Sequence, residues 1–426
     1  MIDSLCTEFP EQPARDPALP LALQGVRIVD FSHFLAGPLA TMILADMGAQ
    51  VIKIEAPGRG DDLRQYPPFD PGVGLGAPFA WANRSKSSVA LDLKSQAGRD
   101  LAMRLVEQAD VVVENFSTGV MQRLGLGYEA CRQRNARLIY CSVSAYGRDG
   151  EFADRLGFDP VAQAESGFVS MNGYADREGV RAASPVMDIS TALMTANAIL
   201  GALVARVRHG FGQSIEVALF DTAVMMTGWA PLQHLFSGRD IGRHANTSPD
   251  TAPSGVFRAS DCSFYLNCGN SKIFQRLASE VIERPDVAQD PRYATPRDRV
   301  AHRDELFALF GDAFARRPWP YWQQRMRSAG VPCGLVRTVA EAIRSPEARA
   351  RGLVSRVRDS RGEWVPQVAS PIRYERTPLA RQRAAPSVGE HTRQVLGEVL
   401  GLDEAALAEL QAAGAFGAAA PAEAAR

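Results

Sequence analysis

One carboxylate stands alone at the start of a long apolar stretch in the middle of the chain. Residues 184–200, SPVMDISTALMTANAIL, contain Asp188 and no other charged residue. A carboxylate acts as a covalent nucleophile when it is ionised and held against an electrophile. The free N–H groups at a helix N-terminus favour negative charge. We therefore expect Asp188 to lie at or just before a helix N-terminus and to stay ionised.

Asp188 also suits a purely structural role. An aspartate at the N-cap of a helix adds about 0.5–2 kcal/mol of stability without any chemistry. The local pattern alone favours this capping role, and a nucleophile remains the alternative at this point.

Other catalytic and metal-binding patterns are absent from the sequence. Neither G-x-S-x-G nor H-E-x-x-H occurs, and the histidines show no paired metal spacing. None of the six cysteines is spaced C-x-x-C, so we expect small buried residues in a reducing compartment. The sequence therefore predicts no metal site and no serine hydrolase.

The bulk composition limits the possible partners. The 47 basic and 48 acidic residues nearly cancel, which disfavours a general nucleic-acid binder. The N-terminal segment has no positive stretch leading into an apolar core, and no window approaches about eighteen uninterrupted apolar residues. We expect a cytoplasmic protein with no nucleic-acid and no membrane partner.

The elements that must position Asp188 alternate between strands and helices. Over residues 25–226, short runs rich in β-branched residues alternate with segments of helical apolar spacing. This pattern predicts an α/β, Rossmann-like domain with a parallel sheet, which binds ligands beyond the carboxyl ends of its strands. No G-x-G-x-x-G follows the first strand, which disfavours a dinucleotide site. The expected strand ends are residues 32–36, 55–62, 92–94, 115–116 and 145–147.

A change of composition suggests a second, smaller domain. With 426 residues the chain is about two to three times a typical domain. A polar Gly-, Pro- and Ser-rich linker precedes a hairpin-like stretch and several helical segments, which fits an α+β fold. We expect an N-terminal tail (1–22), a large domain (23–235), a linker (236–252), a small domain (253–335), a linker that returns to the large domain (336–412) and a C-terminal tail (413–426).

Several segments resemble the class III CoA-transferases, which include formyl-CoA transferase and carnitine CoA-transferase and are related to α-methylacyl-CoA racemase. The segments lie in the family's order and near its spacing, over residues 23–396. They are LQGVRIVDFSHFLAGPLATMILADMGAQVIKIEAPGRGDDLR, NRSKSSVALDLKS, ADVVVENFSTGVMQRLGLGY, GFGQSIEVALFDTAV and AGVPCGLV. The resemblance implies an interlocked homodimer.

The resemblance places the family's catalytic aspartate at Asp188, in PVMDIS. It implies that this carboxylate attacks an acyl-CoA thioester and then carries CoA as an aspartyl-CoA thioester, so acyl-CoA is a substrate and no cofactor is tightly bound. Lys94 and Arg123 are expected to meet phosphates of CoA. The implied CoA-binding residues are His33, Phe34, Ala36, Leu91, Lys94, Asn115, Phe116, Arg123 and Leu124.

Two departures from the family narrow the reaction. The racemase branch has a histidine base where this chain has Phe158 before Asp159, so we favour transfer over racemisation. Leu35 replaces a glutamine of formyl-CoA transferase, and that enzyme's glycine-rich loop is missing after residue 243, which disfavours oxalate and formate. Asp159 is either a carboxylate that supports the site or only the start of a helix before Pro160.

The acceptor is expected to be a small carboxylic acid, with a dicarboxylic acid favoured and succinyl-CoA as the donor. Phe158 and Asp159 are candidate substrate residues. The alternatives to CoA transfer are an acyl-CoA racemase or epimerase and a CoA-binding protein without catalytic function. The candidate partners of the substrate carboxylate are Arg64, Arg243, His244 and Ser248.

Overall fold

The chain folds into two compact units. The structure is a computed structural model that describes residues 7–417. The first unit comprises the chain up to Phe168, Ala182–Trp229 and the chain from Glu347 onward. The second comprises Val169–Arg181 and Ala230–Pro346.

The second unit is larger than the small domain expected at 253–335. It takes in the expected linker, 236–252, and a segment of the expected large domain, 169–181. These two segments are hydrogen-bonded to each other. The Arg243 side chain donates to the carbonyls of Tyr174 (3.0 Å) and Ser170 (3.1 Å), and Ala245 N–H donates to Gly173 (2.8 Å).

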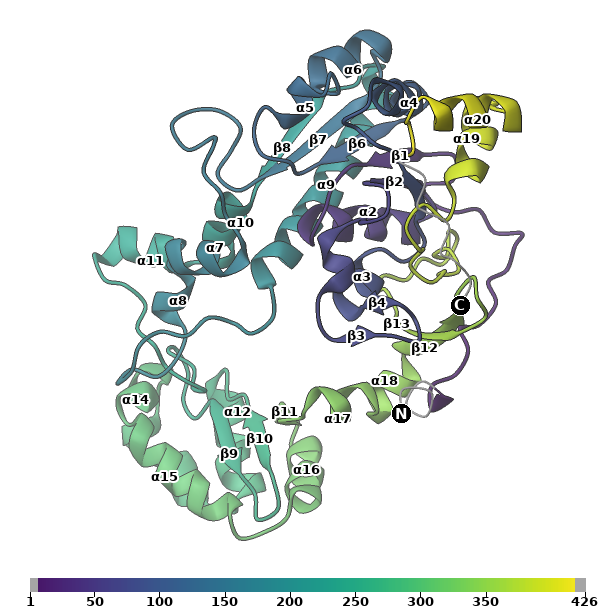
Figure 1. Cartoon of the computed structure of the whole chain (residues 1–426). Coiled ribbons are helices and arrows are strands. Elements are labelled where there is room, and N and C mark those ends of the chain that lie inside the picture. The colour runs from purple at the N-terminus through teal and green to yellow at the C-terminus, as the bar shows by residue number, and fades with distance from the viewer. Residues whose placement is uncertain (1–6, 418–426) are drawn as a thin grey trace. The chain divides into compact units, whose positions relative to one another are not determined.

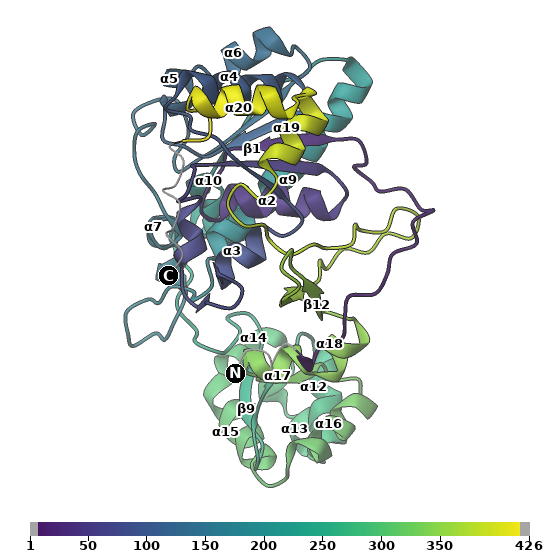
Figure 2. The same ribbon diagram turned by 45° about the vertical axis from the view of Figure 1, so that its right-hand side comes forward.

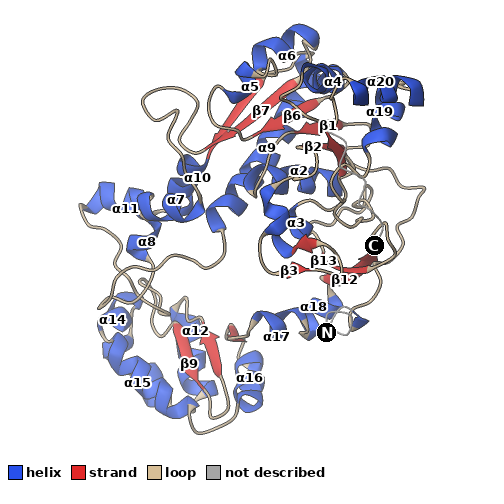
Figure 3. Ribbon diagram, viewed as in Figure 1, coloured by secondary structure: helices blue, strands red, loops and turns tan. Residues whose placement is uncertain are grey.

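A six-stranded parallel sheet forms the centre of the first unit (Figures 1 and 3). The strand order is β5-β2-β1-β6-β7-β8, so the chain moves outward in one direction from β1 and then in the other from β6. This is the Rossmann-type order, and it confirms the predicted fold class. The strands are β1 (Arg27–Asp30), β2 (Gln50–Glu55), β5 (Ser87–Ala90), β6 (Val111–Glu114), β7 (Ile139–Ser144) and β8 (Ser214–Ala218).

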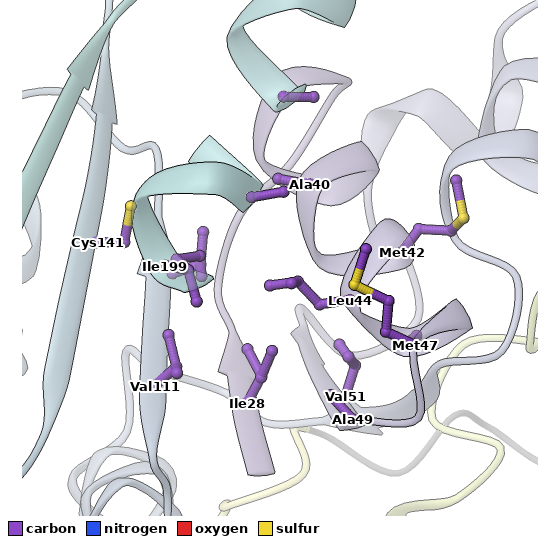
Figure 4. Close-up of a cluster of buried hydrophobic side chains, with 14 of the residues drawn as sticks. Ile28, Ala40, Met42, Leu44, Met47, Ala49, Val51, Val111, Cys141 and Ile199 are labelled. Carbon is purple, nitrogen blue, oxygen red and sulfur yellow. The ribbon is translucent and has the colours of Figure 1, made fainter. Parts of the chain in front are cut away.

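Helices cover both faces of the sheet because alternate strand residues are apolar on each side. Ile28 points to the layer of α2 (Ala36–Asp46) and α9 (Val186–His209), whereas Val29 points to the opposite layer. Figure 4 shows the first of these cores, with Ile199 of α9 close to the β1 and β6 side chains. The opposite layer consists of α4 (Gln96–Glu107), α5 (Val120–Arg123), α6 (Tyr128–Arg134), α19 (Thr392–Leu400) and α20 (Glu404–Ala412) (Figure 2).

The C-terminal part of the chain returns to this sheet. His391 N–H donates to Ser88 of the edge strand β5 (3.0 Å), and Asp92 N–H donates to Ala415 (2.8 Å). Ala415 is fully buried, although it belongs to the segment expected to be a tail. The remaining elements of the first unit include β3 (Phe69–Asp70), β4 (Leu75–Gly76), α3 (Ala77–Ala82), α7 (Asp159–Glu165), α10 (Leu219–Met226), β12 (Val354–Arg358) and β13 (Trp364–Val368).

The second unit has its own aromatic core around a three-stranded antiparallel sheet. Its strands are β9 (Gly255–Arg258), β10 (Ser263–Leu266) and β11 (Cys333–Leu335), which confirms the predicted hairpin. Phe264 and Phe314 are fully buried in this core. The α-helices that contribute side chains to it are α12 (Ser271–Arg276), α13 (Pro285–Gln289), α14 (Pro296–Ala301), α15 (Arg303–Phe314) and α16 (Trp319–Ser328). Helices α11 (Ala230–Ser237) and α17 (Val339–Ile343) of this unit have no buried residue. Helices α8 (Phe168–Met171) and α18 (Pro346–Ala350) lie at the boundaries of the two units.

Helix α9 has the length and apolar composition to cross a membrane, the one such helix among residues 7–417. A core helix of a soluble protein satisfies the same criterion, and one helix is weak evidence. In this structure Ala192, Ala196 and Ile199 of α9 are buried in the core shared with α2. The expectation of no membrane partner stays a prediction.

The cysteines match their predicted character in part. Cys131, Cys141 and Cys268 are buried, Cys262 and Cys333 are half-buried, and all five are free thiols. Cys6 lies outside the described residues. No group of His, Cys, Asp and Glu side chains within residues 7–417 is arranged to hold a metal ion.

Candidate active site

A cavity of about 330 Å³ opens at the carboxyl ends of β1, β6 and β7. The strand order reverses between β1 and β6, which is where sheets of this type bind their ligands. The cavity therefore lies where the sequence pattern predicted a ligand site. The predicted residues that line it are His33, Phe34, Ala36, Asn115, Phe116, Phe158 and Asp188.

Asp188 lies in the first turn of α9, so the predicted helix start is confirmed. The helix begins at Val186, two residues earlier than expected, and Pro185 occupies the N-cap without any side-chain cap. Asp188 is the third helical residue, so the capping role considered for it is wrong. No group in the described part of the chain donates a hydrogen bond to its carboxylate, which faces the cavity.

Asp159 caps α9 in its place. Its Oδ2 accepts hydrogen bonds from the backbone N–H groups of Met187 (2.7 Å) and Asp188 (3.3 Å). Asp159 is also the first residue of α7, just before Pro160, and only 4% exposed. Asp159 therefore starts α7 and also caps α9, so it is more than the start of a helix.

The expectation that Asp188 stays ionised is wrong for the free protein. Burial and then the negative charge of Asp159 raise the pKa of Asp188 to about 7. The N–H groups that would have favoured its charge are bonded to Asp159 instead. The ionised form is therefore a more basic, more nucleophilic carboxylate than an exposed aspartate.

The loop between β1 and α2 is held in a strained conformation at the cavity wall. Phe34 has a φ of 60°, a left-handed conformation that costs a bulky residue about 1–3 kcal/mol. Its N–H donates to Asp61 Oδ1 (3.2 Å). Asn115 accepts from His33 N–H and donates to His33 C=O, each at 2.8 Å. These bonds fix the direction in which the loop presents its rings.

Aromatic rings form one wall of the cavity. The His33 ring lies 5.4 Å from Phe34 and 5.1 Å from Phe116, measured between ring centroids. Phe158 packs edge-to-face on Phe34 at 5.8 Å. Burial lowers the pKa of His33, so its ring is neutral at physiological pH. The wall is therefore apolar and carries no charge of its own.

A buried network of charges supports this loop from behind. Lys53 Nζ donates to Ser32 C=O (2.7 Å) and to Asp61 (3.0 Å). Lys86 Nζ donates to Asp30 (2.9 Å), and both side chains are fully buried. Ser32 and Asp61 lie in the predicted strand-end segments, whereas Asp30, Lys53 and Lys86 were not predicted. A lysine inside an otherwise apolar strand, such as Lys53 in β2, is a signal for a buried ion pair.

Arg64 belongs to the same network and does not line the cavity. Its guanidinium forms two hydrogen bonds with Glu55, at 2.9 and 2.6 Å, and a third with Pro386 C=O at 2.8 Å. The side chain is 3% exposed. The structure therefore does not place Arg64 where it would meet a substrate carboxylate.

The other predicted residues also lie outside this cavity. Lys94 and Arg123 are exposed and Leu91 is buried in the core. Leu124 packs against the core on the same side of the sheet as Leu91. His244 belongs to the second unit, with its ring Nδ1 3.5 Å from Arg303.

Two arginines that sequence reasoning missed line the cavity. Arg148 is largely occupied, since it pairs with Glu114 (2.9 Å) and donates to Phe116 C=O (2.5 Å). Arg155 pairs with Glu165 and lies 4.5 Å above the Tyr146 ring, and its side chain is 45% exposed. Both follow the strand β7, whose end the sequence pattern had marked as a ligand position.

Comparison with known proteins identifies the family. The model of CoA-transferase family III matches residues 23–392. The chain belongs to this family. As a class III CoA-transferase, it is 37% identical over 399 residues to a succinate–glutarate CoA-transferase from Agrobacterium fabrum, covering 91% of this chain and 97% of that protein. It is 38% identical over 340 residues to an acetyl-CoA:oxalate CoA-transferase from Acetobacter aceti, covering 79% and 87%.

A solved structure of the same family agrees with the fold of this CoA-transferase. A CAIB/BAIF family protein from Brucella suis superposes with a TM-score of 0.80 at 35% identity, over 89% of this chain and all of that one. In this CoA-transferase the cavity combines a carboxylate that lacks hydrogen-bond donors with Phe158, a side chain that cannot accept a proton.

Proposed function

We propose that this enzyme moves CoA from an acyl-CoA to a small dicarboxylic acid through an aspartyl-CoA thioester on Asp188. The observation that carries the proposal is the Asp188 carboxylate, which faces the cavity at the reversal of strand order and accepts no hydrogen bond from any group within residues 7–417. An ionised carboxylate in that position is free to attack an electrophilic carbon.

The proposed chemistry consists of two matched half-reactions. Asp188 attacks the thioester carbonyl of the donor, the C–S bond breaks, and CoA thiolate leaves behind a mixed anhydride. The thiolate then attacks the aspartyl carbonyl and releases the donor acid. In the second half the acceptor carboxylate attacks the aspartyl-CoA thioester, and the released thiolate attacks the acceptor's carbonyl in the new anhydride. Asp188 is regenerated as a carboxylate, and no net proton is taken up or released.

The aromatic wall has a role in this scheme. An acid anhydride is hydrolysed by water, so the site must exclude water while the intermediate exists. Phe34, Phe116 and Phe158 cover one side of the cavity that holds Asp188. The strained loop at Phe34 keeps this cover in place.

Relatives and charge both support a dicarboxylic acceptor. The names of the relatives from A. fabrum and A. aceti include succinate, glutarate and oxalate, all dicarboxylic acids. The Arg155 guanidinium lines the cavity and is partly exposed, so it is the candidate partner for a second carboxylate in place of Arg64. Succinyl-CoA is the proposed donor.

The proposed enzyme is a homodimer located in the cytoplasm. Helix α9 carries apolar side chains that the first unit leaves uncovered, including Leu193 (50% exposed), Val204 (53%) and Val207 (84%). An apolar helix face of this kind is usually covered by a partner. Light scattering should give about twice the mass of one chain, and a monomer at micromolar concentration would contradict the dimer.

Chemical trapping tests the proposed intermediate. The protein is incubated with succinyl-CoA and then treated with hydroxylamine or borohydride, and its peptides are analysed by mass spectrometry. We expect modification at Asp188 that depends on acyl-CoA. Modification at another carboxylate, or none while CoA transfer continues, would contradict the aspartyl intermediate.

Substrate screening separates the proposal from the two alternatives. We expect CoA exchange between succinyl-CoA and at least one of glutarate, oxalate, malate, itaconate or mesaconate. Deuterium incorporation from heavy water into a 2-methylacyl-CoA without an acceptor would instead favour a racemase. Tight CoA binding with no exchange across the panel would favour a protein without catalytic function.

A further inference from the structure

Asp159 and Asp188 come from different helices but meet at the N-terminus of α9. Asp159 Oδ2 accepts from Met187 N–H at 2.7 Å and from Asp188 N–H at 3.3 Å. These N–H groups belong to the first turn of the helix, where no intrahelical acceptor exists. The N-cap residue Pro185 offers no side-chain acceptor. Asp159 is therefore the cap of the helix that carries the nucleophile.

A second side chain fixes Asp159 itself. Gln163, one turn later in α7, donates from Nε2 to Asp159 Oδ1 at 2.5 Å. Its Oε1 accepts from Ala182 N–H at 2.8 Å, four residues before α9 begins. Both aspartate oxygens are therefore occupied, and Gln163 is fully buried. The pair connects α7 to the start of α9 at two points.

We propose that Asp159 is a positioning residue for the Asp188 reaction. By binding the N–H groups of the first turn, it fixes the Asp188 backbone and leaves the Asp188 carboxylate without a hydrogen-bond donor. Its own negative charge then lies beside that carboxylate and sets the pH at which the nucleophile forms. The inference rests on the proposed function of Asp188.

Among the charged groups around Asp188, Asp159 is the one whose charge raises the pKa of Asp188. The other charged or titratable side chains lining the cavity are His33, Arg148, Asp154 and Arg155. Four further acids lie on elements that pack against α9, namely Glu165 on α7, Asp221 on α10, Asp46 on α2 and Glu216 on β8. Besides burial, the charge of Asp159 is what raises the pKa of Asp188. A neutral side chain that still caps the helix should therefore change the ionisation of Asp188 without unfolding α9.

Asp159→Asn is the decisive variant, because asparagine caps a helix about as well as aspartate but carries no charge. We expect the variant to fold with a thermal midpoint somewhat below that of the wild type, because the asparagine amide keeps the cap on Met187 N–H but cannot also accept from Gln163 Nε2. The acid limb of the kcat/KM profile should move to lower pH by about one unit. Asp221→Asn is the matched control, since Asp221 is an exposed aspartate at the third position of the neighbouring helix α10. It should leave the profile unchanged.

Asp159→Ala removes both the cap and the charge. It should unfold at a lower temperature than Asp159→Asn and lose activity at every pH tested, because the first turn of α9 is no longer fixed. If Asp159→Ala and Asp159→Asn have the same activity at every pH, capping has no role in catalysis, and the positioning part of the proposal is overturned.

A titration that needs no catalysis separates this inference from the proposed function. Water-soluble carbodiimide modifies carboxyl groups in a way that depends on their protonation, and peptide mass spectrometry reports the extent at Asp188 across a pH series. We expect the midpoint near 7 in the wild type and lower in Asp159→Asn. An unchanged midpoint in Asp159→Asn overturns the inference. A shifted midpoint in a protein that transfers no CoA to any acid supports the effect of the Asp159 charge on the Asp188 carboxylate and overturns the proposed function.

Discussion

Two buried aspartates of the first unit, Asp30 and Asp188, have pKa values that are shifted in opposite directions. Asp30 is fully buried, and although burial opposes its charge, Lys86 and Lys53 lower its pKa to about 2. Asp188 faces the cavity, where burial and the neighbouring Asp159 raise its pKa to about 7. Both are aspartates near the same edge of one sheet. The difference lies in the neighbours. Two lysines lower the pKa of Asp30, whereas within residues 7–417 the one charge that shifts the pKa of Asp188 is a second acid, Asp159.

The comparison separates a structural carboxylate from a reactive one. The Asp30 carboxylate accepts hydrogen bonds from Ser32, Thr41 (2.7 Å) and Lys86 (2.9 Å), so its negative charge is compensated. A compensated carboxylate is a poor nucleophile, because attack would break those bonds. Asp188 has no such bonds to lose. The following predictions test this contrast, beginning with the largest expected effect.

Asp188→Asn should abolish transfer while leaving the fold intact. The amide keeps the size of the side chain but is a poor nucleophile, so we expect a loss of kcat on the order of 10⁴-fold or more. CoA exchange is measured with purified protein, and circular dichroism reports the fold. A folded Asp188→Asn variant with wild-type exchange would show that another group carries the CoA.

Lys86→Met should destabilise the protein, because Lys86 forms the buried ion pair with Asp30. The change leaves Asp30 buried without its nearest cation, which costs about 3–5 kcal/mol. Urea unfolding measures the loss, and Lys272→Met, at an exposed lysine of α12, is the matched control and should show no measurable change. Equal stability of the two variants would mean that the buried network is not what holds the loop.

The pH dependence of activity should follow Asp188 alone. Below about pH 7 its carboxylate becomes protonated, so kcat/KM should fall about tenfold for each unit of pH. Asp30, with a pKa of about 2, stays ionised throughout this range. A profile that is flat between about pH 5.5 and 7.5 would contradict the raised pKa.

The same two groups should affect stability in opposite directions. The folded pKa of Asp188 lies above its ordinary value of 3.8, so its contribution is present below that pH and is lost as pH rises through about 7. The folded pKa of Asp30 lies below 3.8, so its contribution is present above that pH and is lost as pH falls through about 2. Unfolding at several pH values, compared with Asp188→Asn, isolates the first effect. Identical pH dependence in the two proteins would contradict it.

Arg155→Gln should have the smallest effect, confined to the acceptor. Loss of one partly exposed charge–charge contact should raise KM for a dicarboxylic acceptor by about tenfold and leave KM for a monocarboxylic acid unchanged. The two acids are compared on the same preparation. An equal rise of KM for both would mean that Arg155 does not contact the second carboxylate.

The sequence predicted the features that depend on local patterns, namely the α/β fold and the residues at the strand ends. Strand ends led to His33, Asn115 and Phe116, because parallel strands bring their carboxyl ends to one edge. The α/β fold and its strand-and-helix alternation followed from the same periodicity. Asp188 needed the family resemblance as well, since an aspartate near a helix start is usually structural.

The rest depended on contacts between distant residues. Asp159 and Met187 are 28 positions apart, so nothing in the local pattern showed which aspartate would cap α9. The same folding buries Asp188 and places the charge of Asp159 beside it, and both raise its pKa, contrary to the expectation from the local pattern. The sequence pattern made Arg64 a candidate partner of the substrate carboxylate. The ion pair between Arg64 and Glu55 can be seen only in the folded structure.

The return of the chain to β5 also protects the edge of the sheet. The strand's Ser88 C=O bonds to His391 N–H, and its Ala90 N–H donates to Thr392 Oγ1 (3.0 Å). Backbone groups left open on an outer strand can pair with the strand of another molecule and start aggregation. A protein truncated before residue 382 would expose this edge during expression, so solubility as well as stability depends on a segment some 300 residues away from the strand that it covers.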